Sequence, residues 1–426
     1  IKVAGNLEYA YPGQYYLGHD GSNHPWPIDK EGRNLAFYEN NNFESYKSYH
    51  VFGEYTGFYG GYWHDDEFGT GHYAAYDEKP GKKLWIWGLS RQGMIWEDLL
   101  TDTDGQYTEI QSGRLFNQEA PNSTLTPFKH RSFIPGGTDT WTEYWFPVKG
   151  TKGLKYGTPE GSVNLETKNN KVFVWFSPLA ETHDKLKIYQ DNKLLWEKQI
   201  SLSPMQLFSD SLPFNGDASK LKVMLGDFTV LYNADRTDLR LSRPVEMPAD
   251  FDWKSLYGQY LQGREWEKQR AWADAEKCYH TCLASDPNYL PALTAMANLM
   301  TRSAQYPEAL TYATRALSID TYDAAANFIY GVVNARLKKY TDAIDGFSIA
   351  SAALEYRAAS YVEMSKLFLL QNQPGRAKEY ATKAAVTNPM QVPAFELLAV
   401  IARLQADPMA AVKALEQLEA LDPLDH

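Results

Sequence analysis

The sequence predicts two dissimilar parts, an antiparallel β domain in residues 1–241 and an all-α repeat solenoid in residues 253–426. Most of the 12 tryptophans and most glycines lie before residue 250, whereas alanine dominates after it. This contrast is typical of a β part followed by a helical part. Alternating apolar and polar residues mark the first part, and small residues that recur every 34 positions mark the second. Residues 242–252 are the predicted linker.

Composition and charge narrow the classes of partner. The chain carries 42 basic and 53 acidic residues, a net charge of −11, which disfavours nucleic acid or an anionic membrane as a general partner. No apolar run reaches the ~18 residues that suggest a membrane-spanning helix, so no membrane span is expected. No secretory signal is visible, and the chain opens at Ile1 within a strand-like sequence. We therefore expect a processed or truncated product, and the compartment stays open between cytoplasm and periplasm.

The β domain begins with residues 1–80, which are rich in Tyr, Trp, Gly, Asn and His and show little helical periodicity. Short strands and long loops are expected there. Clearer strands follow at Lys82–Gly88 and Tyr107–Ser112, with a turn pair at Asp104-Gly105 between them. Further strands are predicted at Thr140–Pro147, Lys171–Ser177, Leu186–Tyr189, Leu194–Ile200, Lys222–Leu225 and Phe228–Tyr232. Tight turns join the last four into hairpins, which completes an antiparallel sandwich.

Four motifs follow one another in order along this domain. They are Trp26-Pro27, Gly60–Asp65, Pro80–Gly88 and Leu100–Gly113. As a set they resemble a bacterial family of uncharacterised domains, of the galactose-mutarotase-like supersandwich type, that is commonly fused ahead of helical repeats. The resemblance spans residues 10–150. It implies an antiparallel β-supersandwich with carbohydrate recognition on its concave face. It also implies further strands before Ile1, either missing or carried on another chain.

The second part repeats a helical hairpin five times. One column of the repeat is alanine throughout: Ala275, Ala309, Ala343, Ala377 and Ala411. A second column stays small: Gly263, Ala297, Gly331, Ser365 and Ala399. Helices need small side chains where their backbones approach most closely, so these columns predict a repeated helix–helix contact. A turn ends each second helix, with proline in three of five units and Leu354-Glu355 at this place in the third. The columns closely resemble the tetratricopeptide repeat.

The resemblance implies that the concave face of the first helices binds peptides. The carboxylate-clamp form of such repeats needs Lys, Asn and Arg at set inner positions, and here only Asn298 fits. Recognition of an acidic peptide terminus is therefore not expected. The inner columns are largely apolar: Tyr257, Pro291, Ala325, Ala359 and Pro393, then Tyr260, Thr294, Phe328, Val362 and Glu396. We expect this face to pack against a protein partner, the chain's own β domain or another subunit. No capping helix follows the last unit, so further sequence or another surface is expected to cover it.

A candidate sugar site lies on one predicted strand. Tyr107, Glu109 and Gln111 share one face, and Arg114 follows the strand end. A phenol, a carboxylate, an amide and a guanidinium suit sugar hydroxyls, and the carboxylate can act as acid or base. The alternative interpretation is a solvated strand face. Mutarotase-like enzymes place a catalytic glutamate on a late central strand, so the resemblance favours Glu109 as catalytic and the other three residues as substrate-binding.

Two histidines, His64 and His72, flank an acidic run at residues 65–67. We predict that they are catalytic groups that contact the sugar as acids; the alternative is that they are loop histidines with no such role. Histidine and carboxylate are also the usual metal ligands, but neither a helical i, i+4 pair nor a tight spacing is present, so no metal site is predicted.

The loop tryptophans complete the candidate site. Sugars present C–H faces that stack on indole rings, which makes Trp26 and Trp63 predicted substrate-binding residues. Strand tryptophans more often lie in a core, so Trp85 or Trp87 is expected to be buried.

The function predicted first is that of a carbohydrate-binding or carbohydrate-active protein, with glycoside hydrolysis or epimerisation as its acid–base chemistry. Hydrolysis needs a second carboxylate about 5–5.5 Å or about 6.5–9.5 Å from the first, and Glu54, Asp65 and Asp66 are the local options. No cofactor is predicted. The sequence contains no Gly-rich phosphate loop, which disfavours phosphoryl transfer. The competing class is a non-catalytic interaction scaffold that recruits a protein partner through the repeats.

Overall fold

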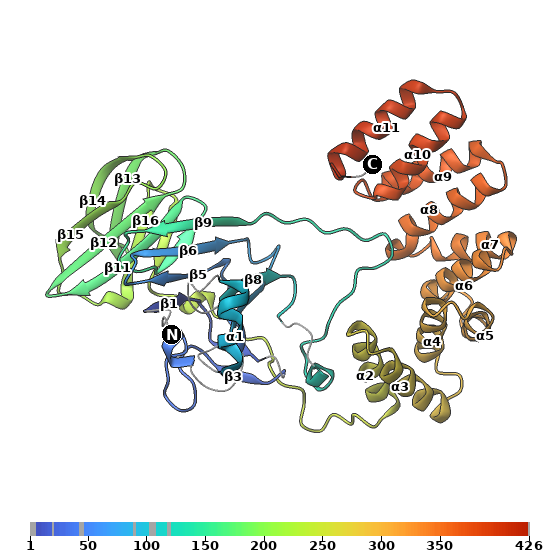
Figure 1. Cartoon of the computed structure of the whole chain (residues 1–426), viewed down its shortest axis with the longest axis horizontal. Helices are drawn as coiled ribbons and strands as arrows, with labels where there is room; N and C mark the ends of the chain where they lie inside the picture. The colour runs from blue at the N-terminus through green and yellow to red at the C-terminus, as the bar shows by residue number, and fades with distance from the viewer. Residues whose placement is uncertain are drawn as a thin grey trace. The chain divides into compact units, whose positions relative to one another are not determined.

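The computed structural model describes residues 6–18, 21–41, 47–87, 91–101, 108–116 and 121–424. The chain divides into two compact units (Figure 1). The first comprises residues 1–129 and 140–247, and the second comprises residues 130–139 and 248–426. The short segment 130–139 is therefore flanked on both sides by the β unit in sequence, yet it packs with the helical unit.

The first unit is built from antiparallel strands. In the described residues these are β1 (Leu7–Ala10), β2 (Tyr15–Leu17), β3 (Asn23–Pro25), β4 (Lys47–Phe52), β5 (Phe58–Trp63), β6 (Phe68–Tyr73), β7 (Gly81–Ile86), β8 (Thr108–Gly113), β9 (Tyr144–Lys149), β10 (Tyr156–Thr158), β11 (Gly161–Lys168), β12 (Lys171–Pro178), β13 (Thr182–Gln190), β14 (Lys193–Leu202), β15 (Phe208–Pro213), β16 (Leu221–Leu225) and β17 (Thr229–Asn233). They form sheets in the orders β1-β5-β6-β9, β3-β2-β4-β7-β8, β10-β11-β12-β15 and β14-β13-β16-β17.

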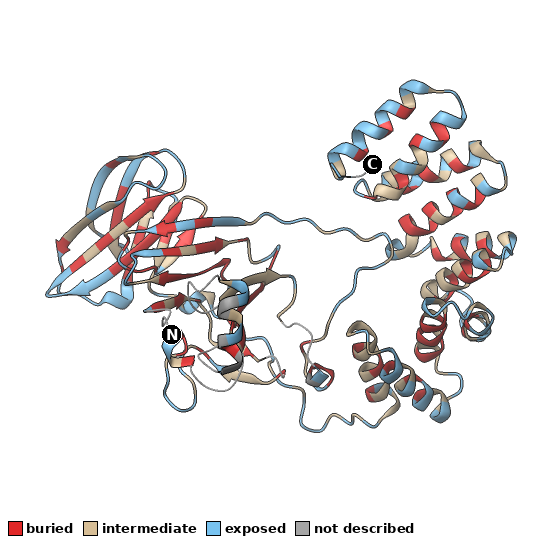
Figure 2. Cartoon of the chain, in the orientation of Figure 1, coloured by how far each residue is buried: buried red, intermediate tan, exposed pale blue. Residues whose placement is uncertain are grey.

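The sheets pack in pairs around separate cores. Tyr9 of β1 and Leu84 of β7 belong to the buried cluster between the first two sheets. Val174 of β12 and Ile188 of β13 belong to the cluster between the last two. Along β16 buried positions alternate with less buried ones, because successive side chains of a strand point to opposite faces. Strands β4, β5 and β7 are instead buried along almost their whole length (Figure 2). The unit is thus a pair of two-layered antiparallel sandwiches.

The strands predicted from alternation are observed, but the connection between β7 and β8 differs from the prediction. The helix α1 (Arg91–Leu100) lies between these two strands, so they are not joined by a tight hairpin. The predicted turn at Asp104-Gly105 lies outside the described residues, as does Tyr107. Gly93 in the first turn of α1 weakens its helical signal, which is why the sequence did not reveal the helix.

The second unit consists of paired helices. Within the described residues they are α2 (Leu256–Lys268), α3 (Trp272–Ser285), α4 (Leu290–Arg302), α5 (Tyr306–Leu317), α6 (Ala324–Arg336), α7 (Tyr340–Ala350), α8 (Leu354–Leu370), α9 (Pro374–Thr387), α10 (Val392–Leu404) and α11 (Pro408–Leu421). Consecutive first helices contact each other, as α4 does α6 and α6 does α8, so α2, α4, α6, α8 and α10 line one face. The predicted antiparallel β domain followed by a tetratricopeptide-like solenoid is confirmed.

The repeat columns explain how each hairpin closes. Members of the alanine column such as Ala309 and Ala343 have no exposed surface. A Cβ added at Gly331 would lie 2.8 Å from the ring of Phe347, so glycine there admits the phenyl ring of the neighbouring helix. A further column recurs every 34 residues with positive φ between the two helices of each hairpin: Arg270, Ala304, Lys338, Asn372 and Ala406. Each reverses the chain in the left-handed conformation that ends many helices.

The third unit departs from the predicted turn. Leu354-Glu355 is not a turn but the beginning of α8, and the connection from α7 lies at residues 351–353. Glu355, unlike the proline found at this place in three of the units, can lie within a helix. The missing proline is not sufficient for an early start, since Thr321 occupies this place in the second unit and α6 begins only at Ala324. The early start makes α8 longer than the other first helices, at 17 residues against 13 for α6.

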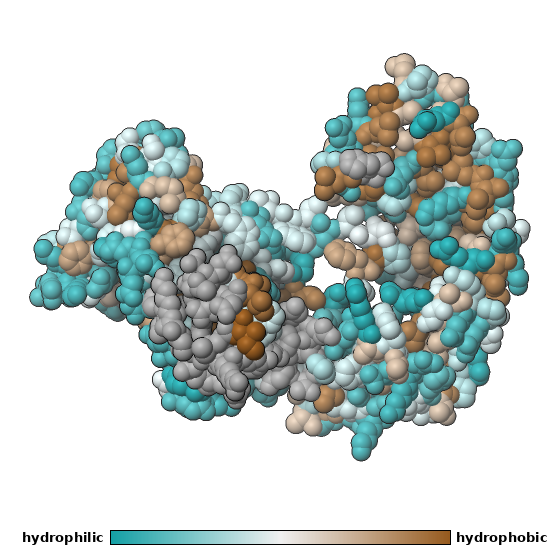
Figure 3. Space-filling view, in the orientation of Figure 1, coloured by the Kyte–Doolittle hydropathy of each residue, from teal (hydrophilic) through white to brown (hydrophobic). Residues whose placement is uncertain are grey.

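Two predictions about the architecture stay predictions: the mutarotase-like supersandwich and the boundaries at residues 241 and 253. Of the helices in the described ranges, none combines the length and apolar character needed to cross a membrane. Apolar side chains gather on the surface of α10 and α11 (Figure 3), where Val400, Leu404 and Leu415 are exposed.

Candidate functional site

Glu109 and Gln111 lie on one face of β8, as their spacing predicted, and their side chains meet: the Gln111 amide donates to the Glu109 carboxylate. On the neighbouring strand β7, Trp85 pairs with Glu109 and Lys83 with Gln111. The Lys83 ammonium lies 4.4 Å from the Trp85 ring centroid. Burial lowers the pKa of Lys83 to about 8, against the raising effect of nearby Glu109. Glu109 is therefore held beside an amide and a cation. Trp85 and Trp87 are half-buried, so neither is the core residue that we expected.

A shallow cavity of about 350 Å³ lies at the end of β8. Gln111, Ser112 and Arg114 line it together with Lys82 and Lys83 of β7. The Arg114 guanidinium donates to the backbone carbonyl of Glu78, which fixes the side chain at the rim. Lys82 is buried, and its ammonium donates to the Thr56 carbonyl at 2.5 Å. The cavity thus brings the predicted binding residues Gln111 and Arg114 together. Tyr107, the third predicted binding residue of this strand, lies outside the described residues.

The predicted catalytic groups are not gathered in one place. Ser112, which contacts His72, lies three residues from Glu109 on β8, so Glu109 and this contact lie on opposite faces of the strand. His64 follows β5, five residues beyond Tyr59, the residue that pairs with His72. At ~3.3 Å per residue, His64 and Tyr59 are roughly 16 Å apart along the chain, so His64 lies far from His72. His64 instead bonds Glu8 at 2.8 Å. Their catalytic roles stay predictions.

Trp26 lies in the core of the first sandwich rather than over a pocket. It is 6% exposed, and its indole N–H donates to the Tyr11 carbonyl at 2.8 Å. Trp63 stacks on Phe68 with ring centroids 5.9 Å apart. Both indoles thus have packing partners within the unit.

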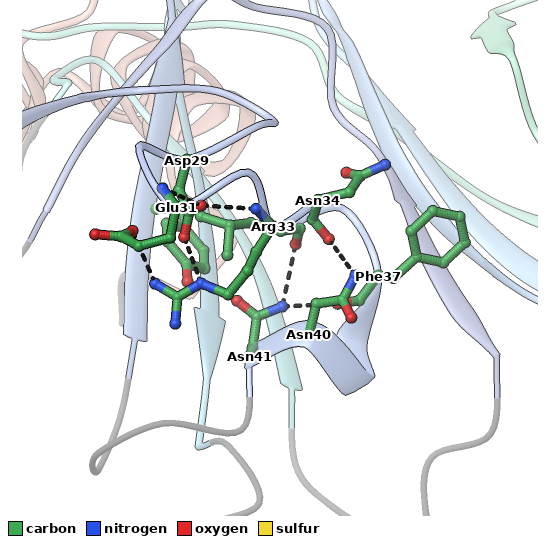
Figure 4. A network of polar contacts seen from close by, with 9 residues as sticks. Asp29, Glu31, Arg33, Asn34, Phe37, Asn40 and Asn41 are labelled. Atoms are coloured by element: carbon green, nitrogen blue, oxygen red, sulfur yellow. Dashed lines mark hydrogen bonds and ion pairs between the residues drawn. The ribbon is translucent and has the colours of Figure 1, made fainter.

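The loop that follows Trp26 is held by its own polar side chains (Figure 4). Asp29 accepts from the Arg33 backbone N–H at 2.8 Å and from its side-chain Nε at 2.6 Å. Asn41 donates to the carbonyls of Leu35 and Phe37 at 3.1 and 2.8 Å. Because this loop satisfies its polar groups internally, its aromatic and polar composition does not by itself indicate a binding site.

A carboxylate that the sequence analysis did not single out organises the polar centre of the first sandwich. Glu143 accepts from the indole N–H groups of Trp141 and Trp145 at 2.6 and 2.9 Å. It also accepts from His72 Nε2 at 2.9 Å and Ser112 Oγ at 3.2 Å. We call these residues, together with Lys79, the Glu143 cluster. The alternation Trp141, Glu143, Trp145 before and into β9 is the sequence signal that marks it.

Two buried basic side chains complete the Glu143 cluster. The Lys79 ammonium forms an ion pair with Glu143, and its side chain is 1% exposed; burial lowers its pKa to about 8. His72 is equally buried. Burial, together with the positive charges of Lys79 and Lys82, lowers the pKa of His72 to about 3. His72 is therefore a neutral imidazole that donates Nε2–H to Glu143, and its buried Nδ1 has no partner in the described residues.

Chemically, the Glu143 cluster is a fixed carboxylate between two exposed indoles. Trp141 and Trp145 are 40% and 53% exposed, while the Glu143 side chain is 24% exposed. Since five donors converge on Glu143, its position is fixed before any ligand arrives. Within the described ranges, no three or more His, Cys, Asp or Glu side chains are grouped to hold a metal ion.

The helical unit contains a second candidate site, on the face of the first helices. Residues His130–Asp139, which we call the strap, contact this face. At one end the His130 backbone N–H donates to the Glu265 carboxylate at 3.0 Å, and His130 Nδ1 bonds it too. The Glu265 side chain is 1% exposed. This buried acid on α2 therefore finds its partner in a segment far away in sequence.

At its other end the strap reaches α9 and α10. The Asn388 amide donates to the Gly136 carbonyl at 2.8 Å. A Cβ at Gly136, whose φ is +64°, would lie 2.7 Å from the Gln391 amide nitrogen and 3.5 Å from Ala359. Glycine thus allows both the backbone turn and the close approach to the helices. The strap is held near both ends through main-chain groups, and it turns at residues 134–137, where the Gly137 N–H donates to the Ile134 carbonyl at 2.9 Å.

Comparison with known proteins finds a family model for the start of the chain. Residues 1–148 match a family model described as "Domain of unknown function (DUF5107)". The predicted resemblance to an uncharacterised domain family is therefore confirmed for the start of the chain. The match ends with β9 (Tyr144–Lys149), so it contains every residue of the Glu143 cluster.

Solved structures similar to the chain cover its helical part. MamA from Desulfovibrio magneticus RS-1 is 18% identical, with 42% of this chain and 100% of that chain covered and a TM-score of 0.37. PilW, a type IV pilus biogenesis factor, is 21% identical, with 40% and 79% covered and a TM-score of 0.37. YrrB, described as "a TPR protein with an unusual peptide-binding site", is 15% identical, with 40% and 88% covered and a TM-score of 0.35.

Proposed function

We propose that this protein is an interaction scaffold that binds an extended segment of a partner protein along the first helices of its solenoid. The strap carries the proposal. It lies on this face as a peptide would, and main-chain groups at both ends bond the side chains of Glu265 and Asn388. Contacts through the main chain tolerate different side chains, so the same anchors suit other extended segments.

The test uses the full chain and a fluorescein-labelled peptide with the strap sequence His130–Asp139. In one variant, residues 130–139 are replaced by a Gly-Ser linker of equal length. The variant is expected to bind the peptide and raise its anisotropy. The wild type is expected to bind at least ~10-fold more weakly, because its tethered strap competes at an effective concentration of about millimolar. A peptide of scrambled sequence is the control. Equal binding by both proteins, or none by the variant, would contradict the proposal.

A second candidate function is carbohydrate binding by the β domain, with the acid–base chemistry predicted from the sequence as its catalytic form. One observation favours it: Trp141 and Trp145 are exposed although both indole N–H groups are fixed on Glu143. Held indole faces suit the C–H faces of a sugar. The Glu109 face and the cavity beside Gln111 and Arg114 are the other surfaces that carry sugar-binding side chains.

A thermal-shift screen against mono- and oligosaccharides tests this second function. A sugar at 100 times its dissociation constant should stabilise the fold by ~2.7 kcal/mol. The shift should vanish in Trp145→Ala and persist in Trp272→Ala, which removes an exposed tryptophan of the helical unit. A Glu109→Gln variant separates the Glu109 face from the Glu143 cluster. A panel without any hit would leave the scaffold as the function.

A further inference from the structure

The helical unit contains a cavity of about 560 Å³ between the strap and helices α2, α4, α6 and α8. The strap is anchored at His130 and Gly136. The side chains between these anchors are not buried against the helices: Phe133 and Ile134 are 68% and 49% exposed. The strap therefore spans the cavity with its ends fixed, and leaves room beside its centre for another chain.

Four cations line this cavity: Arg131 of the strap, Arg264 and Lys268 of α2, and Arg302 of α4. In the part of the chain that the structure describes, none of them forms an ion pair. Burial lowers the pKa of Lys268, and the charges of Arg264 and Arg131 lower it further, against the raising effects of Glu265 and Glu267. Lys268, Arg264 and Arg131 are thus close enough to repel one another, and an anion among them would relieve that repulsion.

The acidic residues of the cavity offset this charge only in part. Against the lowering effect of burial, the charge of Glu267 raises the pKa of Arg264 and of Lys268. The Glu267 carboxylate also accepts from the Tyr279 hydroxyl at 2.7 Å and from the Asn298 amide at 2.8 Å. Glu355 is exposed at the start of α8. Thr294 also lines the cavity, and its buried hydroxyl has no partner among the described residues. Four cations and one unused hydroxyl therefore face two acids.

The rest of the lining is apolar. Phe328, Ile329 and Val332 of α6 also line the cavity, and Phe133 of the strap adds an exposed ring. A ligand that combines carboxylates with an apolar group thus matches both kinds of lining residue. Arg264 lies one repeat before Asn298 in the same column, whereas Lys268 and Arg302 lie four residues further along their helices and Arg131 comes from the strap. The inner helix columns alone therefore did not predict a preference for acidic ligands.

We propose that this cavity binds an extended peptide in which Asp or Glu side chains adjoin an apolar residue, alongside the strap, with Arg131, Arg264, Lys268 and Arg302 contacting the carboxylates. The inference rests on the proposed function and specifies its partner. It makes the strap part of the binding site, because Arg131 comes from the strap. Charge-assisted hydrogen bonds from several cations give such a site its selectivity for acidic sequences.

The experiment titrates the full chain into a fluorescein-labelled, C-terminally amidated decapeptide that alternates Asp or Glu with Phe. A matched peptide carries Asn and Gln instead. The acidic peptide is expected to bind at least ~10-fold more tightly, a preference that weakens with added salt. A third peptide with a free carboxyl terminus and no acidic side chains tests whether the terminus is the group recognised. Tighter binding of that third peptide, or equal binding of acidic and amide peptides, would overturn the proposal.

Two charge-matched variants locate the site. Lys268→Gln with Arg302→Gln removes two cations of the cavity, and is expected to weaken binding of the acidic peptide at least ~10-fold. Lys277→Gln with Lys413→Gln removes two exposed cations of α3 and α11, and is expected to leave binding unchanged. Equal losses in both variants would show general attraction to positive charge and overturn the proposal.

The outcome is separable from that of the proposed function. Suppose that the strap-replaced variant binds the strap peptide but the wild type shows no preference for the acidic peptide. The proposed scaffold function is then supported, and the proposal of an acidic partner is contradicted. If the acidic peptide binds in the cavity while the strap peptide does not bind, the solenoid has a ligand site, but the strap is not an internal peptide ligand.

Discussion

The two units of this protein differ in how their clustered charges are balanced. In the β unit, Glu143 lies among five donors, so its charge is balanced by Lys79 and by neutral hydrogen bonds. In the helical unit, the cavity beside the strap gathers cations such as Lys268 and Arg302 that have no ion-pair partner in the described residues. A satisfied cluster indicates a fixed surface for a neutral ligand, whereas unbalanced charge indicates a site completed by an anionic partner.

The comparison predicts that the largest loss of stability comes from breaking the Glu143 cluster. Glu143→Ala would leave Lys79 and His72, each 1% exposed, without their acceptor. Breaking a buried ion pair costs about 3–5 kcal/mol, measured here as the free energy of unfolding in denaturant. Glu197→Ala, which removes an exposed pair with Lys185, should cost less than about 1 kcal/mol. Similar losses of unfolding free energy in the two variants would contradict the claim that the Glu143 cluster is a buried, stabilising ion pair.

Acid should also act on the Glu143 cluster. The folded-state pKa of His72 is lowered to about 3 from an ordinary value of 6.5. Between these values the unfolded chain binds the proton and the folded chain does not. Stability contributed by His72 is therefore present above pH 6.5 and lost as the pH falls towards 3, by up to about 1.4 kcal/mol per pH unit. His72→Gln should flatten the dependence of unfolding free energy on pH in this window; an unchanged slope would contradict the assignment.

In the helical unit, the only comparable loss is expected where the strap meets α2. Glu265→Gln weakens the bonds to His130 and should cost about 1.5–3 kcal/mol, the range for hydrogen bonds to a charged group. Release of the strap should also speed tryptic cleavage after Arg131. Glu355→Gln, at an exposed acid of α8, is the control that should change neither. Unchanged cleavage in Glu265→Gln would mean that this contact does not hold the strap.

The smallest effect is predicted for the cations of the cavity. Lys268→Gln removes no ion pair; it loses the attraction of Glu265 and Glu267 but relieves the repulsion from Arg264 and Arg131, so the two effects oppose each other. The free energy of unfolding should thus change by no more than ~0.5 kcal/mol, or rise. The same denaturant measurement as for Glu143→Ala checks it. A loss as large as that of Glu143→Ala would show that the cavity is a structural core and not an open site.

Periodic features of the fold were predictable from the sequence, whereas contacts between distant segments were not. The alanine column with Ala309 and Ala343 fixes the helical hairpins, because a repeated contact needs the same small residue each time. Alternation likewise identified β7 and β8, since side chains of a strand change faces at each step. Both signals are local, and both depend on packing that repeats along the chain.

The sites depend on pairs that no local pattern reveals. Glu265 finds His130, and Glu143 finds His72, Lys79 and Ser112, across long sequence separations. Sequence reasoning placed Glu109 and Gln111 on one face of a strand. It did not show which groups of the neighbouring strand lie beside them. It assigned Trp26 to a pocket because the residue was expected in a loop. The sequence could not show that the Tyr11 carbonyl accepts the Trp26 indole N–H in the core.

The most direct test of the account is hydrogen–deuterium exchange of the strap in the full chain. The account predicts that strap amides, His130 above all, exchange more slowly than in an unfolded chain, because the Glu265 carboxylate accepts the His130 N–H. Protection should fall in Glu265→Gln and in Asn388→Ala. Exchange of the wild-type strap at the rate of an unfolded peptide, unchanged in both variants, would contradict the claim that the solenoid holds an extended segment.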